Sequence, residues 1–245
     1  MKIGFLLHVY HLETTDWEEM VWGNPNQNLL GTGTKLIECL LDTHITDEVV
    51  SIVYSGPSTK DGLTEGAYTK QFILDRLAKL HEFPRLKRRL DVLSPDAYEV
   101  FLARVHGLVT GEVIKNTAAE LAEGTKFFAE VKVDRVTQIA AATHAPRCLR
   151  DQVTARFNGW IPVEQQWQVV ASDINYHGVS PYDVVIAEPI HRKDNPLYEY
   201  TPSWVSVTKQ YPHLSLDNKK KVLPKLNEIM QNALADQPDN TEVAN

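Results

Sequence analysis

Short apolar runs rich in valine and isoleucine recur along the chain, with longer amphipathic stretches between them. The runs read KIGFLLHV, VVSIVYSG, VTQIAAAT, WQVVASD and DVVIAEP, at residues 2–9, 49–56, 136–143, 167–173 and 183–189. Continuous apolar runs are typical of strands that are covered on both faces, as in parallel sheets, whereas half-exposed strands alternate apolar and polar residues. The pattern therefore predicts the strands of a buried, mostly parallel sheet.

The stretches between the runs predict helices at residues 33–43, 65–80, 117–132, 146–157 and 217–235. In the fourth, Leu149, Val153 and Phe157 form an apolar stripe at i, i+4 and i+8, and Gly159 stands where the helix should end. Strands that alternate with helices predict an α/β fold. We expect a Rossmann-like open, mostly parallel sheet with helices on both faces.

Residues 81–110 interrupt this alternation. The stretch LHEFPRLKRRLDVL is basic and broken by Pro84, and PDAYEVFLARVHGLV is compatible with a helix followed by a strand. We expect a small helical insertion here. The last ten residues, DQPDNTEVAN, are poor in apolar side chains and predict a disordered tail at 236–245, which leaves a single α/β domain over residues 1–235.

Composition narrows the classes of partner. The chain has 245 residues, 43% of them hydrophobic, which is enough for a large buried core. Its formal net charge of −7 argues against a sequence-independent nucleic-acid binder, which needs a broad basic face. No segment approaches the roughly 20 apolar residues of a membrane-spanning helix, and the opening apolar stretch is too short for a signal peptide.

The two cysteines, Cys39 and Cys148, belong to no CxxC or Cys/His metal spacing and fit a reduced compartment. We therefore expect a cytoplasmic protein whose partner is an anionic small molecule, with neither nucleic acid nor membrane involved. Composition does not determine the oligomeric state.

In an open parallel sheet, ligands bind beyond the carboxyl ends of the strands, so the segments that leave those ends carry the candidate chemistry. The first is YSGPSTKDGLTEGAY, in which Ser55 and Gly56 form a tight turn and glycine permits close approach to the backbone. Glu65 then opens a helix. It is either a carboxylate favoured by the helix dipole or an acid/base group of the site.

The second segment, GEVIKNTAAEL, contains the capping-box pattern Thr117-Ala118-Ala119-Glu120, which alone predicts a structural role. Asn116 beside it and Glu112 upstream are polar residues in a strand-to-helix connection. They are less easily explained by folding, so we expect Asn116 to contact a ligand and Glu112 to be a candidate acid/base group.

The third segment, AAATHAPRCLRDQ, places His144 between a strand and a helix, with Pro146 suited to the first helical turn. Arg147 and Arg150 follow at the positive end of that helix, which is unfavourable unless an anion compensates. The pattern favours an anion bound by the helix N-terminus and a guanidinium group. The alternative is that Arg150 pairs with Asp151 and that His144 is an ordinary hydrogen-bonded loop residue.

The fourth segment, VVIAEPIHRKDNP, follows a strand with Glu188, His191 and Arg192, a second candidate set for acid/base work and anion binding. Common signatures are missing: there is no GxGxxG, no GxxxxGK[ST], no GxSxG and no HExxH. Glu65, Glu112 and Glu188 lack the spacing of a metal site, so we predict no metal.

Three of these segments, in order, resemble motifs of the YdcF-like family, to which SanA and ElyC belong. IVYSGPSTKDGLTEGAY is similar to its strand ending in Ser-Gly with a glutamate opening the next helix. GEVIKNTAAEL is similar to its acidic residue followed by Asn-Thr and a helix-starting glutamate. QIAAATHAPRCLRD is similar to its strand followed by a histidine and, three residues on, an arginine. The resemblance covers about residues 49–192.

This resemblance implies a Rossmann-like fold with a pocket at the strand ends, and it points to Gly56, Glu65, Asn116, Thr117, His144 and Arg147. Because one family member binds S-adenosylmethionine, it favours that cofactor or a nucleotide. The chain departs from the family in three respects. It shows no membrane anchor like those of SanA and ElyC, and Ala142 and Thr143 replace the family's usual serine before the histidine loop. Its first loop, residues 10–33, is long and carries Trp17 and Trp22, and we expect this aromatic loop to cover a base or sugar.

Two functions remain open on these grounds. The first is a small-molecule enzyme in which Arg147 binds an anion, Asn116 and Thr117 orient it, and His144 with Glu65 or Glu112 transfers protons. The second is a non-catalytic module that senses the same ligand. Fold-level analogy does not separate them.

Overall fold

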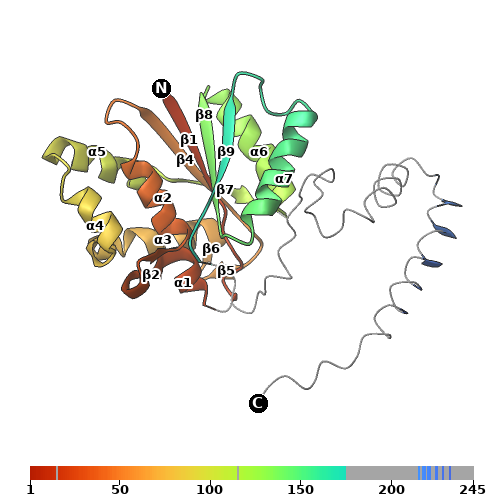
Figure 1. Cartoon of the computed structure of the whole chain (residues 1–245), viewed down its shortest axis with the longest axis horizontal. Helices are drawn as coiled ribbons and strands as arrows, with labels where there is room; N and C mark the ends of the chain where they lie inside the picture. Colours follow the sequence, from red (N-terminus) through yellow and green to blue (C-terminus); the bar gives the residue numbers. More distant parts are fainter. Residues whose placement is uncertain are drawn as a thin grey trace, which may run out of the picture. The chain divides into compact units, whose positions relative to one another are not determined.

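A parallel sheet lies at the centre of the fold (Figure 1), in a computed structural model that describes residues 1–174 except 15 and 115, and scattered residues between 215 and 232. Its strand order is β7–β4–β1–β8–β9. The bounds are β1 Lys2–Leu7, β4 Glu48–Ser55, β7 Val109–Val113, β8 Arg135–Ala140 and β9 Gln166–Ala171. Every neighbouring pair is parallel. The predicted α/β class with an open parallel sheet is confirmed.

Helices cover both faces of this sheet, as Figure 1 shows. α2 (Thr32–Leu41), α3 (Glu65–Leu74), α4 (Pro84–Leu90) and α5 (Pro95–His106) lie on one side, and α6 (Thr117–Glu130) and α7 (Ala145–Phe157) on the other. Side chains of β1 alternate between the two faces. Phe5 and Leu7 pack in the first core cluster and Leu6 in the second, against Phe128.

The first loop is structured and contributes to the core. It contains α1 (Trp17–Trp22), β2 (Gly23–Asn24), the short 3-10 helix η1 (Pro25–Gln27) and β3 (Leu29–Leu30). Trp17 and Trp22 are buried, with ring centroids 5.0 Å and 5.9 Å from those of Phe72 and Phe83 respectively. The expectation that these tryptophans cover a ligand is therefore wrong, because they stabilise the first core cluster instead.

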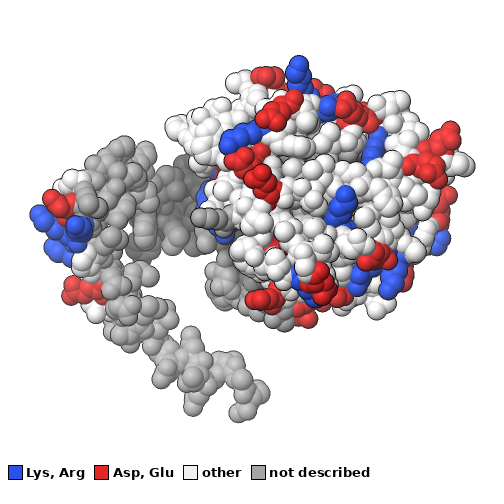
Figure 2. Space-filling model, turned by 180° about the vertical axis from the view of Figure 1, so that it is seen from behind, with Lys and Arg blue, Asp and Glu red and all other residues white. Residues whose placement is uncertain are grey.

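The expected helical insertion is confirmed. Residues 77–106 form the 3-10 helix η2 (Leu77–Glu82), α4 and α5, and the edge strand β7 follows. Two arginines of α4 are neutralised within the fold, since Arg85 pairs with Glu38 and Asp173, and Arg89 with Asp42. On the face seen in Figure 2, basic and acidic side chains are likewise interspersed. A short hairpin, β5 (Thr59–Lys60) and β6 (Leu63–Thr64), connects β4 to α3.

The apolar stripe of α7 does not face the core. Leu149, Val153 and Phe157 are 50%, 61% and 90% exposed, while Cys148 and Ala155 on another face of the helix are buried. An apolar stripe is expected to face the core, but α7 packs through its small buried residues instead. Trp160, just beyond this helix, is also half exposed. Gly159 does follow the helix end, with a φ of 71°.

Some expectations lie outside the described residues. These are the strand at 183–189, most of the helix at 217–235 and the tail at 236–245. The chain groups into two units, Met1–Val185 and Ile186–Asn245, and the described fold belongs to the first. The single domain over residues 1–235 stays a prediction. Among the described residues, no helix has the length and apolar character needed to cross a membrane.

Phe128 provides a test of the core between the sheet and α6. Its side chain is fully buried, and its ring centroid lies 5.9 Å from that of Trp167. We expect Phe128→Ala to lower the free energy of unfolding by about 3–5 kcal/mol, because it leaves a cavity. The control Phe157→Ala, at a 90% exposed position, should change it by less than about 0.5 kcal/mol. Chemical denaturation measures both, and equal losses would contradict the assignment.

Candidate functional site

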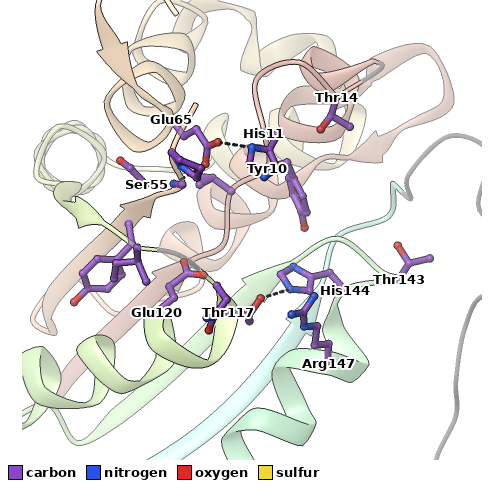
Figure 3. Close-up of a pocket in the computed structure, with 16 residues that line it drawn as sticks. Tyr10, His11, Thr14, Ser55, Glu65, Thr117, Glu120, Thr143, His144 and Arg147 are labelled. Atoms are coloured by element: carbon purple, nitrogen blue, oxygen red, sulfur yellow. Dashed lines mark hydrogen bonds and ion pairs between the residues drawn. The ribbon is translucent and has the colours of Figure 1, made fainter. Parts of the chain in front are cut away.

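A cavity of about 550 Å³ opens at the carboxyl ends of β1, β4, β7 and β8 (Figure 3). The loops after these four strands and the first turns of α3, α6 and α7 supply its lining. The connection after β1 leads to β4 on one side and the connection after β8 leads to β9 on the other, so the loops diverge between β1 and β8, which is where ligands bind in open α/β sheets. The lining residues are Val9, Tyr10, His11, Thr14, Tyr54, Ser55, Gly56, Pro57, Glu65, Ile114, Asn116, Thr117, Glu120, Thr143, His144 and Arg147.

Glu65 forms one wall, and its carboxylate is saturated with donors. It accepts the backbone N–H of Gly56 at 2.6 Å, the backbone N–H of Ser58 at 3.3 Å and the Ser58 hydroxyl, and it pairs with His11 Nδ1 at 3.1 Å. A Cβ at Gly56 would lie 2.2 Å from Glu65 Oε2, so any larger residue there would displace this carboxylate. Glu65 therefore holds the loop after β4 against the start of α3.

Ser55 has a similar local role. Its hydroxyl accepts the backbone N–H of Gly66 at 3.0 Å and donates to Thr64 Oγ1 at 2.9 Å. Thr64 in turn caps α3 by accepting the N–H of Ala67. Strand β4, its following turn and α3 are thus joined into one rigid side of the cavity.

The start of α6 differs from the expected capping box. Asn116 is the N-cap, because its side chain accepts the N–H of Ala119 at 3.0 Å. The capping-box interpretation of Thr117 and Glu120 is wrong, since the cap lies one residue earlier. Both side chains instead reach other partners, Thr117 at His144 and Glu120 at His8.

His144 lies between α6 and α7 with one free ring nitrogen. Its Nε2 is 3.1 Å from Thr117 Oγ1, and its buried Nδ1 has no hydrogen-bond partner in the described part of the chain. Burial, together with the nearby His8 and Arg147, lowers the pKa of His144 to about 3. The ring is therefore neutral near pH 7 and offers the cavity an uncharged nitrogen.

His8, which the sequence analysis did not single out, is fully buried behind His144, with ring centroids 5.4 Å apart. Its Nδ1 lies 2.9 Å from Glu120 Oε2 and its Nε2 lies 3.1 Å from Gln138 Oε1. Burial alone would lower the pKa of His8, but Glu120 and Cys148 together outweigh it and the pKa is raised well above its usual value. The signal that could have identified His8 is its position as a histidine within the apolar run at residues 2–9.

Arg147 lies in the first turn of α7, exposed at the rim of the cavity, and its guanidinium makes no hydrogen bond or ion pair among the described residues. The backbone of this helix start is less available than expected. A turn over residues 142–144 precedes the helix, so the N–H groups of Ala145 and Arg147 already bond the carbonyls of Ala141 and His144, and Pro146 has none. An anion bound at the start of α7 would therefore contact side chains rather than backbone N–H groups.

The remaining candidate residues either do not line the cavity or lie outside the described residues. Arg150 pairs with Asp151 at 2.6 Å and does not line the cavity, so the alternative for Arg150 is confirmed. Glu112 is exposed on the edge strand β7 and does not line it either, because its side chain faces solvent. Glu188, His191 and Arg192 lie outside the described residues.

Three buried polar atoms that have no hydrogen-bond partner among the described residues belong to residues that line this cavity. They are His144 Nδ1, Thr143 Oγ1 and Glu120 Oε1. Buried polar groups are almost always paired, so such a cluster calls for a complementary group from outside the fold. No group of three or more His, Cys, Asp or Glu side chains in the described residues is arranged to hold a metal ion.

Comparisons with models of known protein families, with curated proteins and with solved structures give no match to this chain. The likeness of three motifs to the YdcF-like family therefore stays a prediction. The chemistry of the site rests on its geometry.

The neutral state of His144 has a consequence for stability. The folded pKa of about 3 lies below the unfolded value of about 6.5, so the unfolded chain takes up a proton that the folded protein excludes. This contribution is fully present above about pH 6.5 and is lost as the pH falls toward 3. We expect His144→Gln to lose less stability than the wild type between about pH 7 and about pH 4.

Chemical denaturation at the two pH values measures this difference. His81→Gln is the control, because the His81 side chain is 49% exposed and substituting it should leave the pH dependence as in the wild type. The same acid-induced loss in the wild type and in His144→Gln would contradict the burial of a neutral His144.

Proposed function

We propose that this cavity binds a small molecule with an anionic, phosphate-containing or nucleoside part and performs acid/base chemistry on it. The observation that carries the proposal is a cation, Arg147, that has no partner among the described residues, at a cavity whose lining also holds three buried polar atoms without a partner there. S-adenosylmethionine or a nucleotide is the favoured ligand class, on the likeness to YdcF-like proteins.

Arg147 is the residue that binds the anion. A guanidinium group forms paired hydrogen bonds with phosphate or carboxylate, and the positive end of the helix dipole adds to the attraction. Thr143 lies in the turn before α7 and Thr117 in the first turn of α6, and both line the cavity. Their hydroxyls, rather than backbone N–H groups, complete the anion site.

His144 supplies the acid/base function. In the tautomer whose Nε2–H donates to Thr117, Nδ1 accepts a proton or a hydrogen bond from the ligand. An anion bound at Arg147 would raise the pKa of His144 toward neutrality. Among the carboxylates first considered, Glu65 serves as a wall, since its oxygens are already occupied. Glu112 has no part, because it lies outside the cavity.

A ligand-sensing module remains the alternative, because affinity alone would use the same residues. Roles for Glu188, His191 and Arg192 and a location in the cytoplasm, inferred from the two cysteines, stay predictions.

Binding is tested with inorganic phosphate and adenosine 5′-monophosphate as probes. We expect both to raise the melting temperature of the wild type, since a ligand that binds only the native state stabilises it. Arg147→Gln should weaken the binding of both probes by about tenfold or more, the usual loss of affinity for a charged hydrogen bond. Arg88→Gln, at an exposed position on α4, is the matched control. Unchanged affinity in Arg147→Gln would overturn the anion site.

Enzyme and sensor are separated by His144→Gln. For an enzyme, we expect turnover of the bound ligand to fall by about 10²-fold or more, because the proton-transfer group is lost. Affinity should change by less than about tenfold, since Arg147 remains. Product formation from each stabilising ligand and calorimetric binding provide the two measurements. A wild type that binds but converts none of the probes identifies the sensor.

A further inference from the structure

A chain of hydrogen bonds determines the proton on one side of His8. It begins at the backbone carbonyl of Trp167, which can only accept, and the Gln152 amide donates to it at 3.1 Å. Gln152 Oε1 must then face the Gln138 amide nitrogen, 2.9 Å away. This leaves Gln138 Oε1 facing His8 Nε2 at 3.1 Å. Because an amide oxygen only accepts, His8 Nε2 carries a hydrogen.

The other nitrogen of His8 faces a carboxylate. Its Nδ1 lies 2.9 Å from Glu120 Oε2, a separation that requires a second proton between them. The pair is then either an imidazolium with a carboxylate or a neutral ring with a carboxylic acid. The raised pKa of His8, caused mainly by Glu120 against the effect of burial, favours the ion pair.

The other groups that face His8 are consistent with one charge on its ring. Cys148 of α7 approaches the ring and also favours its protonated form. His144 lies edge-on at 5.4 Å and stays neutral. Two adjacent histidines thus have opposite protonation states, because only His8 has a carboxylate against it.

Only one of the two carboxylate oxygens of Glu120, Oε2, takes part in this pair. Its Oε1 is buried and has no hydrogen-bond partner in the described residues, although Glu120 lines the cavity. The side chain as a whole is 12% exposed. An ionised oxygen in such a position strongly favours a donor, since an unpaired buried charge is costly.

We propose that Glu120, held as a carboxylate by a buried His8 imidazolium, accepts an N–H or O–H group of the ligand through Oε1. This inference rests on the proposed function and narrows it. The ligand carries an amine or hydroxyl group beside its anionic group, which matches the ribose of a nucleotide better than a free anion. His8, Gln138 and Gln152 are positioning residues that act through Glu120.

The charge state of His8 is tested by nitrogen NMR of the full chain labelled at histidine. We expect both His8 nitrogens to be protonated in the wild type from about pH 6 to about pH 8, with the signal assigned by its loss in His8→Gln. In Glu120→Gln, the carboxylate that pairs with the ring is lost and burial should leave the ring neutral near pH 7, with its hydrogen on Nε2. Glu123→Gln, whose side chain on the same helix is 48% exposed, should leave His8 unchanged.

A neutral His8 in the wild type near pH 7 would overturn the ion pair. The binding role is tested with adenosine 5′-monophosphate against inorganic phosphate. We expect the nucleotide to bind the wild type more tightly, and Glu120→Gln to remove about tenfold of that preference. Phosphate affinity should stay equal or rise, because a negative charge is lost.

The outcomes separate this inference from the function on which it rests. If phosphate binds through Arg147 but Glu120→Gln leaves the nucleotide preference intact, the acceptor role of Glu120 is wrong and the anion site stands. If neither probe binds the wild type, the proposed function and the acceptor role both fail, whereas the NMR result still decides the charge of His8.

Discussion

The parallel pairing of β1 with β4 on one side and β8 on the other is the constraint on which the site depends. Parallel strands direct their carboxyl ends to one edge, so the loops after β1, β4, β7 and β8 meet there although they are far apart in the sequence. The same pairing places His8, just beyond β1, against Gln138 of β8. A polar network thereby reaches the cavity from the interior of the sheet.

Two glutamates at this edge of the sheet have different roles because their surroundings differ. Glu65 is surrounded by donors from its own loop and helps to shape the cavity. Glu120 has one oxygen on a buried histidine and the other unpartnered. A saturated carboxylate is a structural group, whereas a half-saturated one retains the capacity to bind a ligand.

The helices α6 and α7 bury different kinds of side chain. α6 presents Leu121 and Phe128 to the second core cluster. α7 instead buries Cys148 and Ala155 and exposes its larger apolar residues. The large apolar residues of α7 therefore do not identify its buried face, and only the tertiary structure shows that its first turn, with Arg147, lines the cavity.

The sequence by itself determined the order of strands and helices, the helical insertion and the loops that form the site. Those features follow from local periodicity, from turn residues and from the rule that parallel strands end at one edge. Seven of the residues singled out there, among them His144 and Arg147, line the cavity. Only the tertiary structure decided their partners: Asn116 rather than Thr117 caps α6, and Glu120 bonds His8, 112 positions away. Local patterns do not specify such contacts, because a hydrogen bond between distant segments depends on how strands and helices pack in three dimensions.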